Sequence, residues 1–379
     1  MAPDQAINAQ LPPPDEVAAS QQLLATTLRV SMMQATLPVA SLLGGIMVKA
    51  IRLHKAGGPE VLRFEEIEIG APGPGEVRLR QGAIGLNFVD TYLRDGTGAY
   101  GDTGAANPLA YPAILGLEGA GVVEAVGPGV DAVALGDRVA YAALPFGAYA
   151  EQRLMPADVL VKLPSGVSEQ IGAAVMLKGL TAEYLLRRCH PIKAGDTILI
   201  HAAAGGCGLL MGQWAAHIGA TVIGTVSSAE KAALARSHGY HHVIDYSRED
   251  FVARVRELTK GTGVSVVYDS VGRTTFTRSL DCLARRGVMV LFGQASGPVD
   301  PVPLSALTDR GSLFLTRPGL LDYVATRAEL VTATNALFDL IVRGILRVEI
   351  GQTFALKDAA DAHIALEARR TYGSTLLIP

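Results

Sequence analysis

The sequence predicts an α/β protein in which an all-β domain precedes a doubly wound parallel sheet. Between residues 48 and 154, short runs of alternating apolar residues are separated by glycine and proline, a pattern typical of a compact, barrel-like β domain. From about residue 168 onward, strand-like apolar runs alternate with helical segments, which indicates a parallel sheet with helices on both faces. With 379 residues, the chain is long enough for two domains.

Both domains have a definite expected order of elements. We expect β-domain strands at 48–53, 62–69, 76–84, 119–126, 138–142 and 148–154. A helical sector begins near Ser168, and the parallel sheet should use strands at 197–201, 221–226, 242–245, 264–269 and 287–292. A long helix at about 323–343 follows, and a final strand, STLLIP, returns to the β domain.

The segment 197–224 is the centre of this arrangement. A strand-like run is followed by small residues and then by a helical run, with the glycine pattern Ala202-x-x-Gly205-x-x-Gly208. This is a variant of the dinucleotide-binding fingerprint, which is weak alone but here has the required strand and helix around it. The unpaired N–H groups at the start of such a helix bind anions.

The next turn indicates which dinucleotide binds. The acidic residue that usually binds the ribose 2′-OH of NAD is replaced by Ser227 and Ser228. Glu230 is the nearest carboxylate, but Ser227-x-x-Glu230 resembles a capping box for the next helix. Lys231 lies in the first turn of that helix, where a cation is unfavourable unless an anion is nearby. A 2′-phosphate would be such an anion, so we favour NADP(H); the alternative is an ordinary solvated lysine.

Composition excludes other classes of protein. The net charge of −3 gives no basic surplus for nucleic acid binding. The three cysteines are scattered, which favours neither a metal site nor a disulfide framework and makes a cytoplasmic location the default. Residues 1–46 differ from the rest, with Pro12-Pro13-Pro14 and an uncharged but Pro- and Gly-interrupted run at 30–46. We expect a disordered extension outside the fold and no membrane span; the alternative is a cleaved presequence.

Several motifs carry a family resemblance, and they occur in this order: HKAGGPEVL, IGLNFVDTYLRDG, LGLEGAGVVEAVGPGV, GDRVAY, LKGLTAEYLL, HAAAGGCG, VYDSVG and RRGVMVLFG. From residue 48 to the end, the chain strongly resembles the zeta-crystallin-like NADPH:quinone oxidoreductases of the medium-chain dehydrogenase/reductase superfamily. The resemblance implies a GroES-like β domain (47–171 and 311–379) around a Rossmann domain (172–310), and a homodimer. It implies NADPH as cofactor and a quinone or other electron-poor molecule as acceptor.

The same superfamily contains zinc alcohol dehydrogenases, whose catalytic zinc needs three protein ligands. In the matching places this sequence has Asn87 instead of a cysteine, and Gly116-Leu117-Glu118 instead of Gly-His-Glu. Because Glu118 alone cannot hold zinc, we expect no metal.

The resemblance also implies roles for individual residues. Asn87, Asp90 and Tyr92 should line the cleft near the nicotinamide, with Asn87 orienting substrate or ribose, Asp90 orienting a partner, and Tyr92 stacking on the acceptor or donating to its oxygen. The alternative for this trio is loop packing and turn capping. The residues expected to bind the cofactor are Lys178, Thr181, Ala204, Gly205, Gly206, Cys207, Ser227, Lys231, Tyr246, Ser270, Phe292, Gly293 and Arg369. Among these, Lys231, Tyr246 and Arg369 are assigned to the 2′-phosphate.

The expected function is therefore NADPH-dependent reduction of quinones by hydride or electron transfer, without metal or flavin. A quinone suits a site without a Lewis acid because the anion that forms on it is delocalised. One alternative is an enone or 2-alkenal reductase, which the same site could serve. The other is an NADPH-binding protein with a structural or RNA-binding role.

Overall fold

The computed structural model describes residues 45–97 and 109–379. Residues 1–44 of the predicted extension lie outside the described part. The first strand, β1 (Ile46–Leu53), begins one residue earlier than the predicted domain start, because Ile46 pairs with Ile69 of β2.

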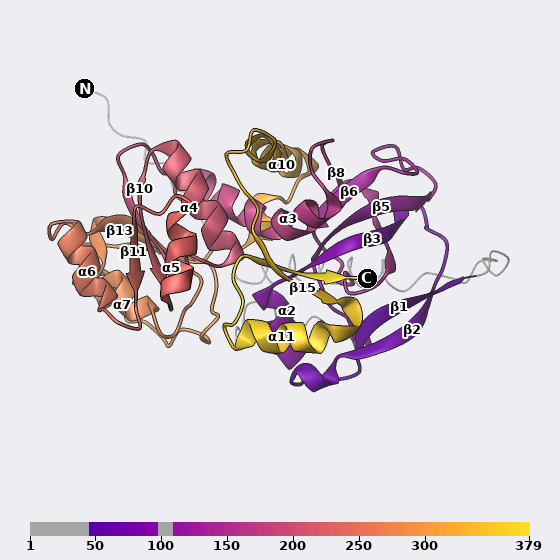
Figure 1. Ribbon diagram of the computed structural model, residues 1–379, viewed down its shortest axis with the longest axis horizontal. Helices are drawn as coiled ribbons and strands as arrows, with labels where there is room; N and C mark the ends of the chain where they lie inside the picture. The colour runs from indigo at the N-terminus through magenta and orange to yellow at the C-terminus, as the bar shows by residue number, and fades with distance from the viewer. Residues whose placement is uncertain (1–44, 98–108) are drawn as a thin grey trace, which may run out of the picture. The chain divides into compact units, whose positions relative to one another are not determined.

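The β domain contains two sheets (Figure 1). The smaller has the order β2-β1-β4 and the larger the order β15-β16-β3-β5-β6-β8, with β7 also pairing with β3. Their bounds are β2 Arg63–Ile69, β3 Glu76–Leu86, β4 Ala113–Ile114, β5 Glu118–Val126, β6 Arg138–Ala142, β7 Gln152–Pro156, β8 Val161–Lys162, β15 Ile350–Ala355 and β16 Ser374–Ile378. The expected return of the tail is confirmed, since β16 runs antiparallel to β3.

One β-domain strand was predicted too early. We expected a strand at 148–154, whereas β7 starts at Gln152. The backbone N–H groups of Ala148 and Tyr149 instead donate to the carbonyl oxygens of Gly116 and Leu115. Those bonds hold the segment before β7 as a loop.

The second sheet is fully parallel and has the order β11-β10-β9-β12-β13-β14. The strands are β9 Thr197–Ile200, β10 Thr221–Val226, β11 His242–Asp245, β12 Val264–Asp269, β13 Leu283–Leu291 and β14 Phe314–Thr316. Counted from β9 as the first strand, this is the order 3-2-1-4-5-6 of a dinucleotide-binding sheet. The predicted α/β class is confirmed, and ligands of such a sheet bind where the order reverses, here between β9 and β12.

Both faces of this sheet are buried, as a doubly wound fold requires. Ile198 and Ile200 of β9 pack in one apolar cluster, and Leu199 between them packs in another. The helices joining the strands are α4 Gly206–Ile218, α5 Ala229–Arg236, α6 Phe251–Leu258, α7 Phe276–Leu280 and α8 Ser305–Thr308. The parallel sheet includes β14 and so extends past residue 310, our expected domain limit. The assignment of segments to two domains otherwise stays a prediction.

Helix α3 (Glu169–Tyr184) joins the two sheets. It begins where expected, because the Ser168 hydroxyl accepts a hydrogen bond from the Ile171 N–H at 3.1 Å. The helix packs on β3, β5 and β6 of the β domain and on α4 of the other domain. A π-helical turn, Leu185–Cys189, ends it. This position explains how α3 can present Lys178 and Thr181 to a cavity between the domains.

The long C-terminal helix is shorter than predicted. We expected one helix at about 323–343, but the structure has α9 (Leu320–Tyr323) and then α10 (Arg327–Val342). Thr326 starts α10 through a capping box with Glu329, which fixes the start four residues later. The remaining helices that bear on the site are α2 (Phe88–Asp95) and α11 (Ala359–Glu367). In the described part of the chain, every helix is too short or too polar to cross a bilayer.

Candidate functional site

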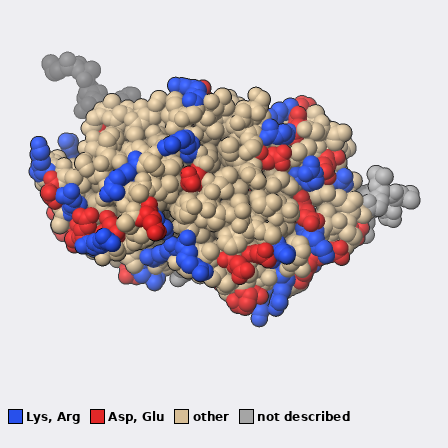
Figure 2. Space-filling model, viewed as in Figure 1, with Lys and Arg blue, Asp and Glu red and all other residues tan. Residues whose placement is uncertain are grey.

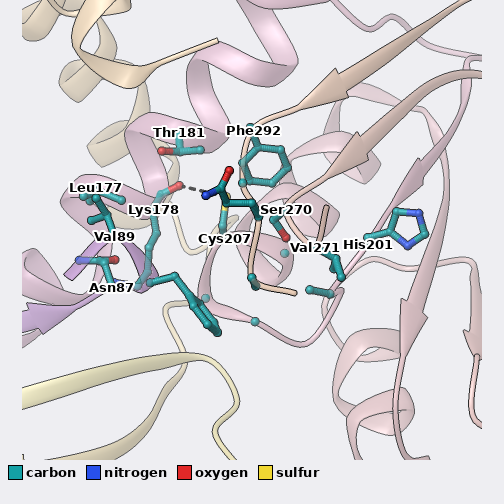
Figure 3. A pocket seen from close by; sticks show the side chains of 18 of the residues that line it. Asn87, Val89, Leu177, Lys178, Thr181, His201, Cys207, Ser270, Val271 and Phe292 are labelled. Atoms are coloured by element: carbon teal, nitrogen blue, oxygen red, sulfur yellow. Dashed lines mark hydrogen bonds between the residues drawn. The ribbon is translucent and has the colours of Figure 1, made fainter. Parts of the chain in front are cut away.

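A cavity of about 790 Å³ lies at the carboxyl ends of the parallel strands and continues to the β domain. Its size is within the usual range for small-molecule and cofactor sites. The predicted site residues line it, with the exception of Asp90. In Figure 3, Asn87 and Lys178 lie on one side and His201 lies at the opposite end. Residues from both domains therefore form one elongated site.

The glycine loop forms the middle of the cavity wall. Helix α4 begins at Gly206, and Ala202 before it has a left-handed backbone with φ of 54°. A Cβ atom on Gly208 would lie 2.4 Å from the Ala202 carbonyl oxygen, so the helix can approach the loop only with glycine there. The Gly373 N–H donates to the Ala204 carbonyl oxygen at 2.9 Å and ties this loop to the C-terminal segment. The N-terminus of α4 thus faces the cavity as an anion-binding element.

The start of α5 differs from the prediction. The N-cap is Ser228, whose hydroxyl accepts from the Lys231 N–H at 3.2 Å, so the expected Ser227–Glu230 capping box is wrong. The helix begins one residue later than that motif requires, which makes Lys231 the third helical residue. The Ser227 side chain does not cap the helix, and Ser227 lines the cavity.

Two cations converge beside Ser227. The Lys231 ammonium donates to the backbone carbonyl oxygen of Arg369 at 2.8 Å, and both residues line the cavity. Burial, and then the charge of Arg369, lower the pKa of Lys231. Arg369 has a left-handed backbone with φ of 57°, which is costly for a residue other than glycine. Adjacent like charges on a strained backbone suit a binding site for a multiply charged anion.

At the other end of the cavity, the side chains of Lys178 and Asn87 both contact Glu118. The Lys178 ammonium lies 2.7 Å from Glu118 Oε2, and the Asn87 amide nitrogen lies 2.8 Å from the same oxygen. Glu118 is fully buried, whereas Asn87 and Lys178 reach the cavity. The sequence did not indicate this pairing, since we considered Glu118 only as a metal ligand.

Asp90 does not reach the cavity, which corrects its predicted place beside the nicotinamide. Its carboxylate accepts from the Asn87 N–H at 2.9 Å and from the Tyr149 hydroxyl at 3.0 Å. His363 Nε2 lies 3.1 Å from that hydroxyl, and its Nδ1 lies 3.0 Å from Arg94, which can only donate. Burial lowers the pKa of His363 to about 3, so this ring is neutral with its proton on Nε2. Asp90 thus caps α2 within a buried network.

Burial raises the pKa of Asp90 from 3.8 to about 7, although the bonds from Asn87 and Tyr149 oppose this shift. At a pH between these two pKa values, Asp90 is ionised in the unfolded chain but still protonated in the folded chain. Its contribution to the free energy of unfolding therefore falls as pH rises. The effect is at most about 4 kcal/mol.

We expect Asp90→Asn to remove this pH dependence. The free energy of unfolding of the variant, relative to the unchanged protein, should rise between about pH 5 and about pH 8. Chemical denaturation at both values measures it. A difference between the two proteins that is the same at both pH values would contradict the assignment.

Tyr92 lines the end of the cavity that the β domain contributes. Burial raises its pKa well above the usual range, so the phenol is neutral, and the Gln294 backbone hydrogen-bonds to it. Gln294 and Arg317 were not predicted from the sequence; Arg317 donates to Gln294 Oε1 at 2.6 Å, and both line the cavity. Gln294 follows the predicted strand at 287–292, which was the available signal, whereas Arg317 follows β14, a strand that was not predicted. The wall here is otherwise largely apolar and includes Phe88, Val89, Leu144, Phe146 and Leu321.

The remaining predicted residues lie between these ends. Ser270 and Gly293 follow neighbouring strands and are so close that a Cβ on Gly293 would lie 2.8 Å from the Ser270 carbonyl oxygen. Burial raises the pKa of Cys207 to about 12, which favours the protonated thiol over the reactive thiolate. Thr181, Ala204, Gly205, Gly206, Tyr246 and Phe292 also line the cavity. Thr274, Thr275, Arg278, Phe251 and Thr371 are further lining residues that the sequence did not reveal.

A metal site was not expected. Within residues 45–97 and 109–379, no three His, Cys, Asp or Glu side chains are grouped as metal ligands. The Glu118 carboxylate is already paired with Lys178. The absence of a metal stays a prediction.

Comparison with known proteins identifies the family. The family described as "Alcohol dehydrogenase GroES-like domain" matches residues 73–165, and "Zinc-binding dehydrogenase" matches residues 206–318. The chain is 53% identical to a quinone oxidoreductase from Pseudomonas aeruginosa over 88% of this chain and 100% of that protein. It belongs to the quinone oxidoreductase family of the medium-chain dehydrogenase/reductase superfamily. The GroES-like and Rossmann architecture implied by the resemblance is thereby confirmed.

Two other proteins similar to this chain are informative. A 2-haloacrylate reductase from a Burkholderia species is 48% identical over 88% of this chain and 99% of its own length. The solved structure of Escherichia coli quinone oxidoreductase complexed with NADPH superimposes with a TM-score of 0.83 at 48% identity. That likeness covers 87% of this chain and 100% of the other.

Proposed function

We propose that the protein reduces quinones with NADPH, by hydride or electron transfer and without a metal or flavin. The observation that carries this proposal is one continuous cavity with a cationic corner at Lys231 and Arg369 and a largely apolar end at Tyr92. The names of its family members, quinone oxidoreductases among them, support the same activity.

The residues present fit NADPH. The α4 N-terminus would bind the pyrophosphate. Lys231, Tyr246 and Arg369, together with Ser227, would bind the 2′-phosphate. When bound, NADPH supplies the reducing equivalents. The chain's own contribution is to hold cofactor and acceptor together and to limit water around them with the apolar wall.

Tyr92 is suited to meet the acceptor oxygen. Its raised pKa keeps the phenol protonated, so it can donate a hydrogen bond but cannot act as a base at neutral pH. A quinone needs little further help, because the negative charge that develops on it is delocalised. The reduced acceptor can then take protons from solvent.

An electron-poor alkene is the second candidate acceptor, because the chain is also similar to a 2-haloacrylate reductase. Assays of NADPH oxidation with 9,10-phenanthrenequinone and with an α,β-unsaturated ketone separate the two. Faster turnover with the quinone supports the proposal, and preference for the ketone would replace it with a double-bond reductase. Tight NADPH binding without turnover of either acceptor would revive the non-catalytic alternative. Figure 2 shows acidic and basic side chains interspersed over the visible face, which does not favour RNA.

We also propose a homodimer formed through β14. This strand is the last of the parallel sheet, and its Phe314 and Leu315 side chains are 61% and 43% exposed. An exposed apolar edge strand is suited to pair with a second copy. Light scattering should give the mass of two chains for the unchanged protein and of one chain for Phe314→Glu. A single-chain mass for both would contradict the proposal.

The free thiols of Cys189, Cys207 and Cys282 support a reducing, cytoplasmic location.

A further inference from the structure

Glu118 occupies a place built for a carboxylate. It lies on β5 opposite Gly85 of β3, and it is fully buried. A Cβ atom on Gly85 would lie 2.2 Å from Glu118 Oε2, so the neighbouring strand leaves room for the carboxylate only because it has glycine there. Oε1 accepts from the Leu177 N–H at 2.7 Å, and Oε2 accepts from Lys178 and Asn87. Three donors thus converge on one buried side chain.

This arrangement fixes the orientation of the Asn87 amide. A carboxylate paired with an ammonium group only accepts hydrogen bonds, so Asn87 must direct its NH₂ group toward Glu118. The same nitrogen also donates to the Gly85 carbonyl oxygen at 3.3 Å. Both amide hydrogens are therefore used inside the protein. The oxygen, Oδ1, faces the Asp90 N–H in the capping box at the start of α2, and its second lone pair is what Asn87 can offer to a ligand.

A second buried carboxylate holds the Asn87 backbone. Asp90 accepts from the Asn87 N–H, so the residue is fixed at both its main chain and its side chain. From the sequence we expected Asn87 to orient substrate or ribose, and a free amide could do so both as donor and as acceptor. As held here, it can accept from an N–H or O–H group but cannot donate to a quinone carbonyl.

We propose that Glu118 is a positioning residue for the reductase, holding Asn87 with its oxygen available to the cofactor and Lys178 as a cation beside it. The inference rests on the proposed NADPH-dependent function. A ribose hydroxyl or a carboxamide N–H of NADPH is the kind of group that Asn87 can then accept from. Figure 3 shows Asn87 and Lys178 next to each other at the cavity.

The test is a cycle of substitutions at two positions. In Glu118→Gln, one amide oxygen must serve three donors, and the new NH₂ group should turn the Asn87 amide so that its nitrogen faces outward. In Asn87→Asp, two carboxylates would repel each other. The double variant reverses the pair, because the amide introduced at position 118 can donate to the carboxylate introduced at position 87. It thereby restores an outward oxygen and a carboxylate near Lys178. We expect each single change to weaken NADPH binding by at least about tenfold, the scale of one charge-assisted hydrogen bond.

We expect the double variant to bind NADPH several-fold more tightly than either single variant. NADPH affinity is measured by fluorescence titration, alongside KM and kcat with a quinone. Glu183→Gln is the matched control, because it removes another buried carboxylate of an ion pair on the same helix as Lys178. It should lower the melting temperature without changing NADPH affinity.

Two results would overturn the proposal: a Glu118→Gln variant with unchanged NADPH affinity and kcat, or a double variant that binds NADPH no more tightly than the tighter-binding single variant. Because binding is measured without an acceptor, it remains interpretable if the proposed quinone reduction fails.

Discussion

Gly208→Ala should abolish measurable NADPH binding and lower the free energy of unfolding by about 1–3 kcal/mol, the usual cost of overpacking. The added methyl group would lie 2.4 Å from the Ala202 carbonyl oxygen and 2.8 Å from that of Ala203. Both are backbone atoms, so α4 must move away from the loop. That movement displaces the N–H groups expected to bind the pyrophosphate. Isothermal titration with NADPH and chemical denaturation measure the two effects.

Gly205→Ala is the matched control for this loop. Its Cβ would have one near neighbour, the Ala202 carbonyl oxygen at 3.2 Å, and Gly205 lines the cavity. We expect little change in stability but weaker NADPH binding, because the methyl group would occupy space needed by the ligand. If Gly208→Ala bound NADPH normally, the pyrophosphate would have to be placed elsewhere.

Lys231→Ala should weaken NADPH binding by about 1–3 kcal/mol, the scale of a hydrogen bond to a charged group. Binding of NADH should be nearly unchanged, because NADH lacks the 2′-phosphate. Loss of Lys231 also removes its bond to the Arg369 backbone, so part of the effect should come from a less fixed Arg369. Titration with both cofactors measures the difference.

The control for Lys231 is Arg236→Ala. Arg236 is an exposed cation in the last turn of the same helix and does not line the cavity. It should leave both affinities unchanged. Equal losses of NADPH and NADH in Lys231→Ala would remove the 2′-phosphate assignment.

The parallel sheet could be predicted because its signals are local. Residues 221–226, 242–245 and 264–269 are largely apolar or β-branched runs between turns, and the structure has strands with these bounds. The glycine pattern likewise indicates that the start of the helix lies very close to the backbone of the loop before it. Such features depend on residues near one another in the chain.

The details of the site depend on contacts that cannot be predicted from the sequence alone. Ser227 and Ser228 can each cap a helix, so the sequence does not decide which of them is the N-cap of α5. Asp90 lies in a motif that the family resemblance assigns to the site, but the turn of α2 directs its side chain toward Tyr149 and away from the cavity. The partnership of Glu118 with Lys178 depends on packing between β5 and α3, 60 residues apart.

The measurement that tests the central proposal most directly is oxidation of NADPH and of NADH by 1,4-benzoquinone, followed at the nicotinamide absorbance. We expect turnover with NADPH and a kcat/KM for NADH lower by at least about tenfold, from the loss of contacts at Lys231 and Arg369. Equal rates with the two cofactors, or no oxidation of NADPH by the quinone, would contradict this account.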